Sequence, residues 1–309
     1  MKSLAILICI IVLVCVISCV GCGNAPTIGK PTDDNSAIAY PEFTDETEVI
    51  INGYDADAME PFITKDGNFL FFNSLNDGVH TSLYYAVKVN DTHFAFRGEI
   101  SGVNGTGPHL DAVASLDVHH NFYFVSTRNY PRIFENYQTG VFTQGAVTNA
   151  QSVPGNFYIR SPGWIIMDAE ISKDGSLLYY VNAHFTGTAL PDQSKLGIAE
   201  KNASMFKKIS LSDSILSKVN DPRYLVYAPA ISSDGKELYF TRIEKGTLTT
   251  EICVSVRLQN NAAFSAPKKI EISGSNAEAP TLTDDGRRLY YHKKLGIDGK
   301  YHIFTKGRI

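Results

Sequence analysis

Short apolar stretches separated by polar turns run through the chain from about residue 43 to its end. One arrangement recurs: an apolar stretch, a Ser/Thr-x-Asp-Gly turn, and a second apolar stretch that ends in aromatic residues. Short apolar runs bounded by turn residues are typical of β-strands, and Asp-Gly supplies the positive φ angles of a tight hairpin. Because no long segment has apolar residues at helical spacing, the pattern predicts an all-β protein.

The arrangement is an internal repeat with five copies. They occupy residues 59–72, 112–125, 169–180, 228–240 and 279–291. Four copies have Asp-Gly at the turn, and the second has His119-His120 in its place. The turn positions Asp66, His119, Asp174, Asp234 and Asp285 follow one another at intervals of 53, 55, 60 and 51 residues. A repeat of this length indicates a solenoid or a propeller.

Two further strands follow the hairpin within a copy. In the fourth copy these are the apolar residues 251–256 and the more polar residues 264–270. Four antiparallel strands per unit at this period are typical of propeller blades. The last copy ends after its third strand, whereas residues 43–53 resemble a fourth strand without a copy of their own. Pairing these two parts would cover two sheet edges. The sequence thus predicts a five-bladed β-propeller, closed by an N-terminal strand in the C-terminal blade.

The Ser/Thr-x-Asp-Gly-x-x-Leu-Tyr-Phe unit, as in residues 232–240, resembles the TolB-type, WD-repeat-like β-propeller repeat. The resemblance covers residues 43–309, and it implies a fold without implying one function. The family includes binding platforms, protease-associated domains and some glycan-active enzymes.

The first 22 residues have the layout of a targeting segment. Lys2 precedes an apolar run from Leu4 to Val20, as in a secretory signal. Residues 16–19 end in Cys19 and resemble a bacterial lipobox, while Cys22 is a second, poorer candidate for lipidation. An uncleaved anchor or a plain cleaved signal are the alternatives, because about 17 apolar residues are the lower limit for a membrane span.

These features predict three regions. Residues 1–22 form a lipoprotein-type signal or anchor, residues 23–42 form a flexible tether rich in Pro, Thr, Asp, Asn and Gly, and residues 43–309 form the propeller domain. Each of the alternatives for the first region places the domain outside the cytoplasm, in the periplasm or at the cell surface. We therefore expect the membrane to be a partner through the N-terminal anchor.

Charge and cysteine content narrow the function classes. The chain has 28 basic and 32 acidic residues, a net charge of -4 that gives no attraction to nucleic acid. Four of the five cysteines lie in the first 22 residues, so Cys253 has no internal partner for a disulfide or a thiolate metal site. The chain has no His-Glu-x-x-His motif. We expect a monomer without metal or cofactor.

Carboxylates near the first strand of each copy are candidates for chemistry, because first strands usually line the channel of a propeller. They are Glu60, Asp111, Asp168, Glu170 and Glu278. Converging carboxylates could bind a cation or act as acid and base on a sugar. Relative to the turn, however, only Glu60 and Asp168 share a position. This mismatch favours the interpretation that these carboxylates are solvated or accept hydrogen bonds from strand ends, and that none is catalytic. In the alternative, in which the protein is an enzyme, the catalytic residues are Glu60, Asp168, Glu170 and Glu278.

Residues 129–137 and 157–164 combine aromatic side chains with Arg. On loops, such residues suit sugar stacking or a protein-binding hot spot, and on strands they belong to the core. The predicted ligand-binding residues are Trp164, Tyr130, Arg132 and Arg160.

Two functions follow as hypotheses. The first is an extracytoplasmic, membrane-anchored binding platform that recognises a protein or a glycan through one propeller face. The alternative is a glycan-active hydrolase or lyase that uses carboxylates at the channel mouth. Two carboxyl groups about 5–10 Å apart in a concave pocket would favour the enzyme. A channel lined with Ala, Ser and Thr would favour the binding platform. Of the two functions, the sequence alone favours the binding platform.

Overall fold

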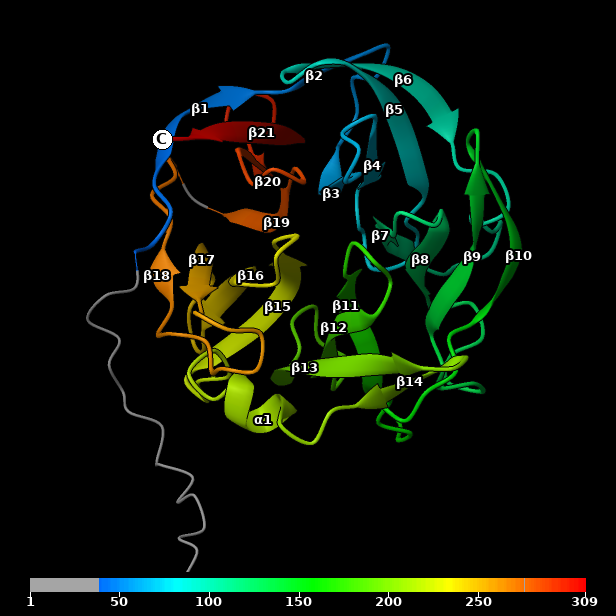
Figure 1. The fold of residues 1–309 in the computed structure, drawn as a ribbon. Coiled ribbons are helices and arrows are strands. Elements are labelled where there is room, and N and C mark those ends of the chain that lie inside the picture. Colours follow the sequence, from blue (N-terminus) through cyan, green and yellow to red (C-terminus); the bar gives the residue numbers. More distant parts are fainter. Residues whose placement is uncertain (1–38, 275) are drawn as a thin grey trace, which may run out of the picture. The chain divides into compact units, whose positions relative to one another are not determined.

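The computed structural model describes residues 39–274 and 276–309. They form five small antiparallel sheets arranged in a ring (Figure 1). The first sheet contains β3 (Met59–Ile63), β4 (Phe69–Asn73), β5 (Leu83–Asn90) and β6 (His93–Glu99), and the second contains β7 (Asp111–Leu116), β8 (Asn121–Ser126), β9 (Tyr137–Thr143) and β10 (Ala146–Ser152). The third contains β11 (Trp164–Ile171), β12 (Leu177–His184), β13 (Gln193–Asn202) and β14 (Met205–Lys208). The fourth contains β15 (Tyr224–Ile231), β16 (Glu237–Glu244), β17 (Thr250–Val256) and β18 (Lys268–Lys269). A single helical turn, α1 (Ser212–Ile215), precedes β15.

The fifth sheet confirms the predicted closure of the ring. It contains β19 (Ala277–Leu282), β20 (Arg288–Lys294), β21 (Tyr301–Arg308) and the N-terminal strand β1 (Phe43–Glu48). β1 pairs antiparallel with β21, with Glu48 opposite Phe304. The chain then continues into β2 (Ile50–Asn52), which pairs in parallel with β6 of the first blade. The N-terminal segment thus joins the fifth blade to the first, and this second pairing was not predicted.

The predicted Asp-Gly turns are confirmed. In the first blade the Thr64 hydroxyl donates to the Asp66 carboxylate at 2.6 Å and accepts the backbone N–H of Phe69 at 3.0 Å. Gly67 has a φ of +72°. Matching hydroxyl–carboxylate bonds occur at Ser172/Asp174, Ser232/Asp234 and Thr283/Asp285.

The second blade forms the same turn with different residues. Asp117 accepts the backbone N–H groups of His119 and Asn121 at 2.8 and 2.9 Å, and His120 has a φ of +64° where the other copies have Gly. The two histidines therefore lie in a turn.

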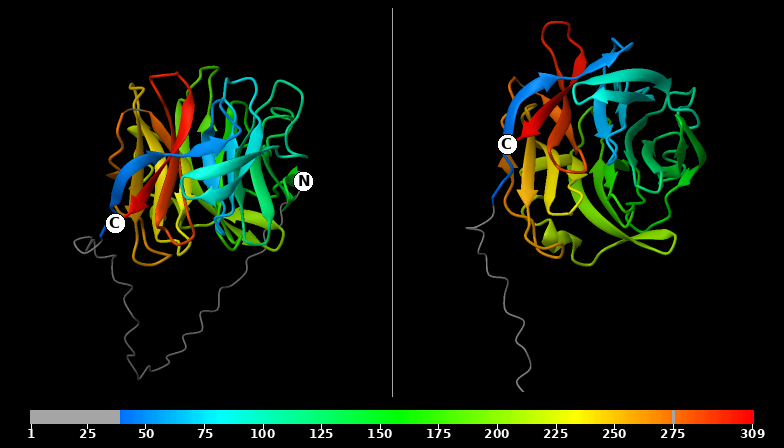
Figure 2. Two further views of the ribbon diagram at one scale, coloured as in Figure 1. Left: turned by 90° about the horizontal axis from the view of Figure 1, so that it is seen from above. Right: turned by 45° about the horizontal axis from the view of Figure 1, so that its top comes forward.

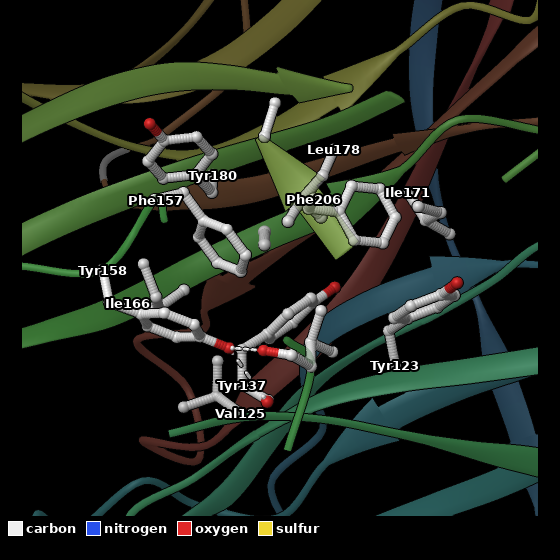
Figure 3. Packing of buried hydrophobic residues seen from close by; sticks show 13 residues of the cluster. Tyr123, Val125, Tyr137, Phe157, Tyr158, Ile166, Ile171, Leu178, Tyr180 and Phe206 are labelled. Atoms are coloured by element: carbon white, nitrogen blue, oxygen red, sulfur yellow. Dashed lines mark hydrogen bonds between the residues drawn. The ribbon is translucent and has the colours of Figure 1, made fainter. Parts of the chain in front are cut away.

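Aromatic residues fill the spaces between the blades. Figure 3 shows one such cluster, in which Tyr123 and Tyr137 of the second blade pack with Leu178 and Tyr180 of the third. Phe157 and Tyr158 belong to this cluster, with ring centroids 4.1 Å apart. Burial of one such side chain stabilises the fold by about 1.5–3 kcal/mol.

The candidate lipidation residues Cys19 and Cys22 lie outside the described residues, as does most of the predicted tether. Tyr40, near the end of that tether, donates a hydrogen bond to the carbonyl of Ala266 at 2.7 Å. The described contacts of the propeller thus begin slightly before Phe43. In the part of the chain that the structure describes, no helix combines the length and hydropathy needed to cross a membrane.

Candidate functional site

A cavity of about 780 Å³ opens on one face of the propeller, at one mouth of the central channel. Its wall comes from loops between second and third strands, from loops that lead into first strands, and from strand residues near these loops. The Asp-Gly turns lie at the opposite ends of the first strands, on the other face of the ring, which the left view of Figure 2 shows edge-on. Most of the wall is apolar, including Leu110, Ile165, Phe185, Leu225, Ile243 and Leu248.

Three carboxylates line this cavity from three different blades. Glu60 lies on β3, Asp168 on β11 and Glu278 on β19. Glu278 lies one position earlier than the other two relative to its turn. Each of the three strands contains a β-bulge beside its carboxylate, and a bulge changes the direction of nearby side chains. Alignment of the repeat copies at their turns therefore did not predict that Glu278 lines the same cavity as Glu60 and Asp168.

Glu60 lies in a network of buried polar groups. The side-chain amide of Asn73 donates to its carboxylate, and the amide oxygen of Asn73 accepts the backbone N–H of Val113 at 3.2 Å. The backbone N–H of Glu60 donates to Nδ1 of His292 at 3.0 Å. Burial, together with the charges of Asp168 and Glu278, raises the pKa of Glu60 to about 8.

Asp168 and Glu278 have fewer partners. The Asp168 carboxylate accepts the backbone N–H of Ala228, while its Oδ2 has no hydrogen-bond partner within the described residues. Glu278 accepts the hydroxyl of Tyr227. Burial raises the pKa of each carboxyl to about 7, and the charge of Glu278 adds to the effect at Asp168. The three groups therefore lie close enough to affect one another's ionisation, and each of them titrates near neutral pH.

Glu170, the fourth carboxylate of the alternative set, does not line this cavity. It forms an ion pair with Lys65 at 3.2 Å, and both side chains are buried. It also accepts the backbone N–H of Ile231 at 3.3 Å. Nearer the opposite face, Lys173 pairs with Asp284 at 2.7 Å. These ion pairs occupy the far side of the channel, so Glu60, Asp168 and Glu278 face one open side.

Asp111, at the start of β7, also forms an ion pair and a hydrogen bond outside the cavity. It pairs with Arg128 at 2.9 Å and accepts the backbone N–H of Gly105 at 3.0 Å. It holds a loop in place and does not join the three carboxylates.

The four predicted ligand-binding residues lie in different places. Tyr130 lines the cavity, and its hydroxyl accepts the backbone N–H of Gly163 at 2.6 Å. Trp164 is half-buried and lies against the ring of His184, with centroids 5.1 Å apart. Arg132 is exposed, and Arg160 pairs with Glu135 at 2.7 Å. Trp164, Arg132 and Arg160 are not among the residues that line the cavity.

Sequence reasoning missed Asn73, Tyr227, His292 and Tyr301. Tyr227 and Tyr301 line the cavity, whereas Asn73 and His292 support Glu60 from behind. Each is a single polar or aromatic residue of a strand, and no motif marks it. The described residues contain no group of His, Cys, Asp and Glu side chains arranged to hold a metal ion.

No protein-family model matches the sequence, and no curated protein matches it. Solved structures do share the fold. The catalytic domain of a family 62 α-L-arabinofuranosidase from Coprinopsis cinerea matches with a TM-score of 0.52 and 11% identity, covering 87% of this chain and 97% of that one. A family 117 glycoside hydrolase from the marine bacterium Zobellia galactanivorans matches with a TM-score of 0.51 and 10% identity, covering 87% and 90%.

A TolB propeller from Acinetobacter baumannii matches more weakly, with a TM-score of 0.42 and 12% identity over 82% of this chain and 55% of that one. At these identities the comparisons show only the fold, which the two glycoside hydrolases share with this chain.

Proposed function

We propose that this protein hydrolyses glycosidic bonds in the cavity at the channel mouth. One observation carries the proposal: carboxyl groups from three blades meet in one concave site and affect one another's ionisation. Glycoside hydrolysis needs one carboxyl group that still holds its proton and a second that has lost it. Interacting carboxyl groups that titrate near pH 7 provide this pair at neutral pH.

The surroundings of the groups assign the roles. Glu60, with a pKa of about 8, keeps its proton at pH 7 and is the proton donor to the leaving oxygen. Glu278 accepts the hydroxyl of Tyr227, a bond that favours its ionised form, and is the base or nucleophile. Asn73 is a positioning residue, because it holds the Glu60 carboxyl from behind. The glycoside hydrolases of known structure that share the fold support the idea that a five-bladed propeller can house this chemistry.

Activity of the purified domain on a panel of aryl glycosides and polysaccharides tests the proposal. We expect Glu60→Gln and Glu278→Gln to lose about 10²-fold or more in rate, since general acid–base catalysis contributes about that much. Glu200→Gln, which changes an exposed carboxylate of β13, is the matched control and should retain full activity. The proposal fails if no substrate is cleaved, or if both cavity variants cleave as fast as the wild type.

The apolar wall of the cavity favours a second candidate function, which is binding without hydrolysis. In this proposal the same face holds a protein or glycan ligand, and Tyr130 supplies an aromatic contact. A pull-down from membranes and a glycan array would identify the ligand, and Tyr130→Ala should weaken its capture.

For either function we propose a location outside the cytoplasm, with a lipid anchor on Cys19 or Cys22. The sequence pattern of the first 22 residues supports it. Growth with labelled palmitate tests this: we expect the label in the wild type and its loss from Cys19→Ser or from Cys22→Ser. A wild-type protein without label would exclude the lipid anchor.

A further inference from the structure

The cavity contains three acidic side chains and no basic one. Of the described residues that line it, none is Lys, Arg or His. The nearby Lys65 is already paired with Glu170, and His292 uses Nδ1 to accept the backbone N–H of Glu60. A buried ionised carboxylate without a cationic partner is costly, so without a ligand the site lowers its negative charge only by holding protons.

Two of the three carboxyl groups have the roles of acid and base in the proposed hydrolysis, and the third affects the acid through its charge. The reaction uses two, and Glu60 and Glu278 fill those roles in the proposed function. Asp168 remains, and only 4% of its surface is exposed. Its Oδ2 has no hydrogen-bond partner among the described residues, although Asp168 lines the cavity. A buried, unpartnered acceptor in a binding cavity indicates that its donor comes with the ligand.

From this geometry we infer that the substrate carries a primary ammonium group, as an unacetylated amino sugar does, and that Asp168 binds it. This inference rests on the proposed function, because it takes Glu60 and Glu278 as acid and base and assigns Asp168 to a group of the substrate. An ammonium group has three N–H donors and accepts none, which suits the unpartnered Oδ2 of Asp168. The described residues offer no arrangement for a metal ion, so an organic cation is the fitting partner.

The apolar wall strengthens such a contact. Side chains such as Leu225, Ile243 and Phe185 line the cavity, and an ion pair next to apolar side chains is stronger than one in water. The aromatic ring of Tyr301 also lines the cavity, but the ammonium of Lys294 already lies over it, 5.4 Å from the ring centroid, so the ion pair with Asp168 is the main contact for the cation. A neutral N-acetylated sugar does not gain this ion pair, and it leaves Asp168 without a partner.

Binding of a cation also has a proton signature. The Asp168 carboxyl, with a pKa of about 7, holds a proton in part of the free protein at pH 7 and loses it when a positive charge arrives beside it. Calorimetric titration in two buffers with different ionisation enthalpies measures this release. The ligands are a β-1,4-linked glucosamine tetrasaccharide and its N-acetylated counterpart. The pair n-butylamine and n-butanol serves as a probe that does not depend on sugar or linkage.

We expect both amines to bind at least tenfold more tightly than their neutral counterparts at pH 7, with release of protons. Asp168→Asn should abolish this preference, and the control Glu200→Gln should retain it. Thermal melting checks that the Asp168 variant is folded. If it is not, proton release by the wild type still decides the question.

Hydrolysis assays on the same two tetrasaccharides and on the aryl glycoside panel separate the two proposals. Cleavage of neutral glycosides without any preference for amines in binding overturns this inference and leaves the proposed function standing. Tight, proton-linked binding of amines without cleavage of any glycoside supports the cation site and overturns the proposed hydrolysis. If amines do not bind and no glycoside is cleaved, both fail.

Discussion

Asn73 connects two blades through its side-chain amide. It is fully buried at the end of β4, donates to Glu60 of its own blade, and accepts the backbone N–H of Val113 in the next one. A buried asparagine whose donor and acceptor are both used is costly to replace, because its former partners stay buried without a bond. At the scale of single residues, the site therefore depends on a side chain that does not line the cavity.

Asn73→Ala should lower the free energy of unfolding by about 1–3 kcal/mol, because the N–H of Val113 loses its acceptor. Urea unfolding at pH 7 measures the change. Ser255→Ala is the control, since the Ser255 hydroxyl is buried without a partner and its removal should be neutral or stabilising. Equal losses in the two variants would contradict the role given to Asn73.

Among the elements, β1 determines whether the ring is closed. Glu46 of β1 accepts hydrogen bonds from Lys293 of β20 and from the hydroxyl of Tyr291, the latter at 2.7 Å. Burial raises the pKa of Glu46, but hydrogen bonds from Lys293, Ser273 and Tyr291 lower it by more, so the pKa lies below its ordinary value. One carboxylate thus ties the N-terminal strand to the C-terminal blade.

Glu46→Ala should destabilise the propeller by about 2 kcal/mol, the usual size of hydrogen bonds to charged groups, because Lys293 loses its buried partner. Asp45→Asn on the same strand is the control, since Asp45 is exposed and its change should have no measurable effect. Thermal and urea unfolding compare the two. The closing role of Glu46 is refuted if its variant unfolds like the wild type.

For the whole molecule, the ring brings Glu60, Asp168 and Glu278 together although more than a hundred residues separate each from the next. In the unfolded chain these groups titrate near their ordinary values of 4.5, 3.8 and 4.5, and in the folded protein near about 8, 7 and 7. The folded state therefore binds more protons between these values. The contribution of the three carboxyl groups to stability is complete below about pH 4 and is lost as pH rises through their pKa values in the folded protein.

The free energy of unfolding should accordingly fall between pH 5 and pH 8, by about 1.4 kcal/mol per pH unit for each group that titrates. Glu60→Gln removes one such group, so its stability should fall less steeply, and the variant should exceed the wild type at pH 8. Urea unfolding at four pH values measures both slopes. Identical slopes in the two proteins would show that Glu60 has no raised pKa.

Much of the architecture could be predicted from particular residues. Asp66-Gly67 and its counterparts mark turns through local φ preferences, and residues 43–53 match the fourth strand that the last copy lacks. The turn and the closure were therefore predicted correctly. The site was predicted only as a list of carboxylates, of which Glu60, Asp168 and Glu278 meet in the cavity and Glu170 pairs with Lys65.

The sequence by itself determined the number of blades, the hairpin turns and the strand that closes the ring, because these depend on periodicity and on local backbone preferences. Only the tertiary structure decided which carboxyl groups share a cavity and which of them remains without a partner. Bulges in β3, β11 and β19 change the direction of individual side chains, and the ring brings distant blades together. Burial and the nearby charges then set the pKa values, and no single segment of the chain contains that information.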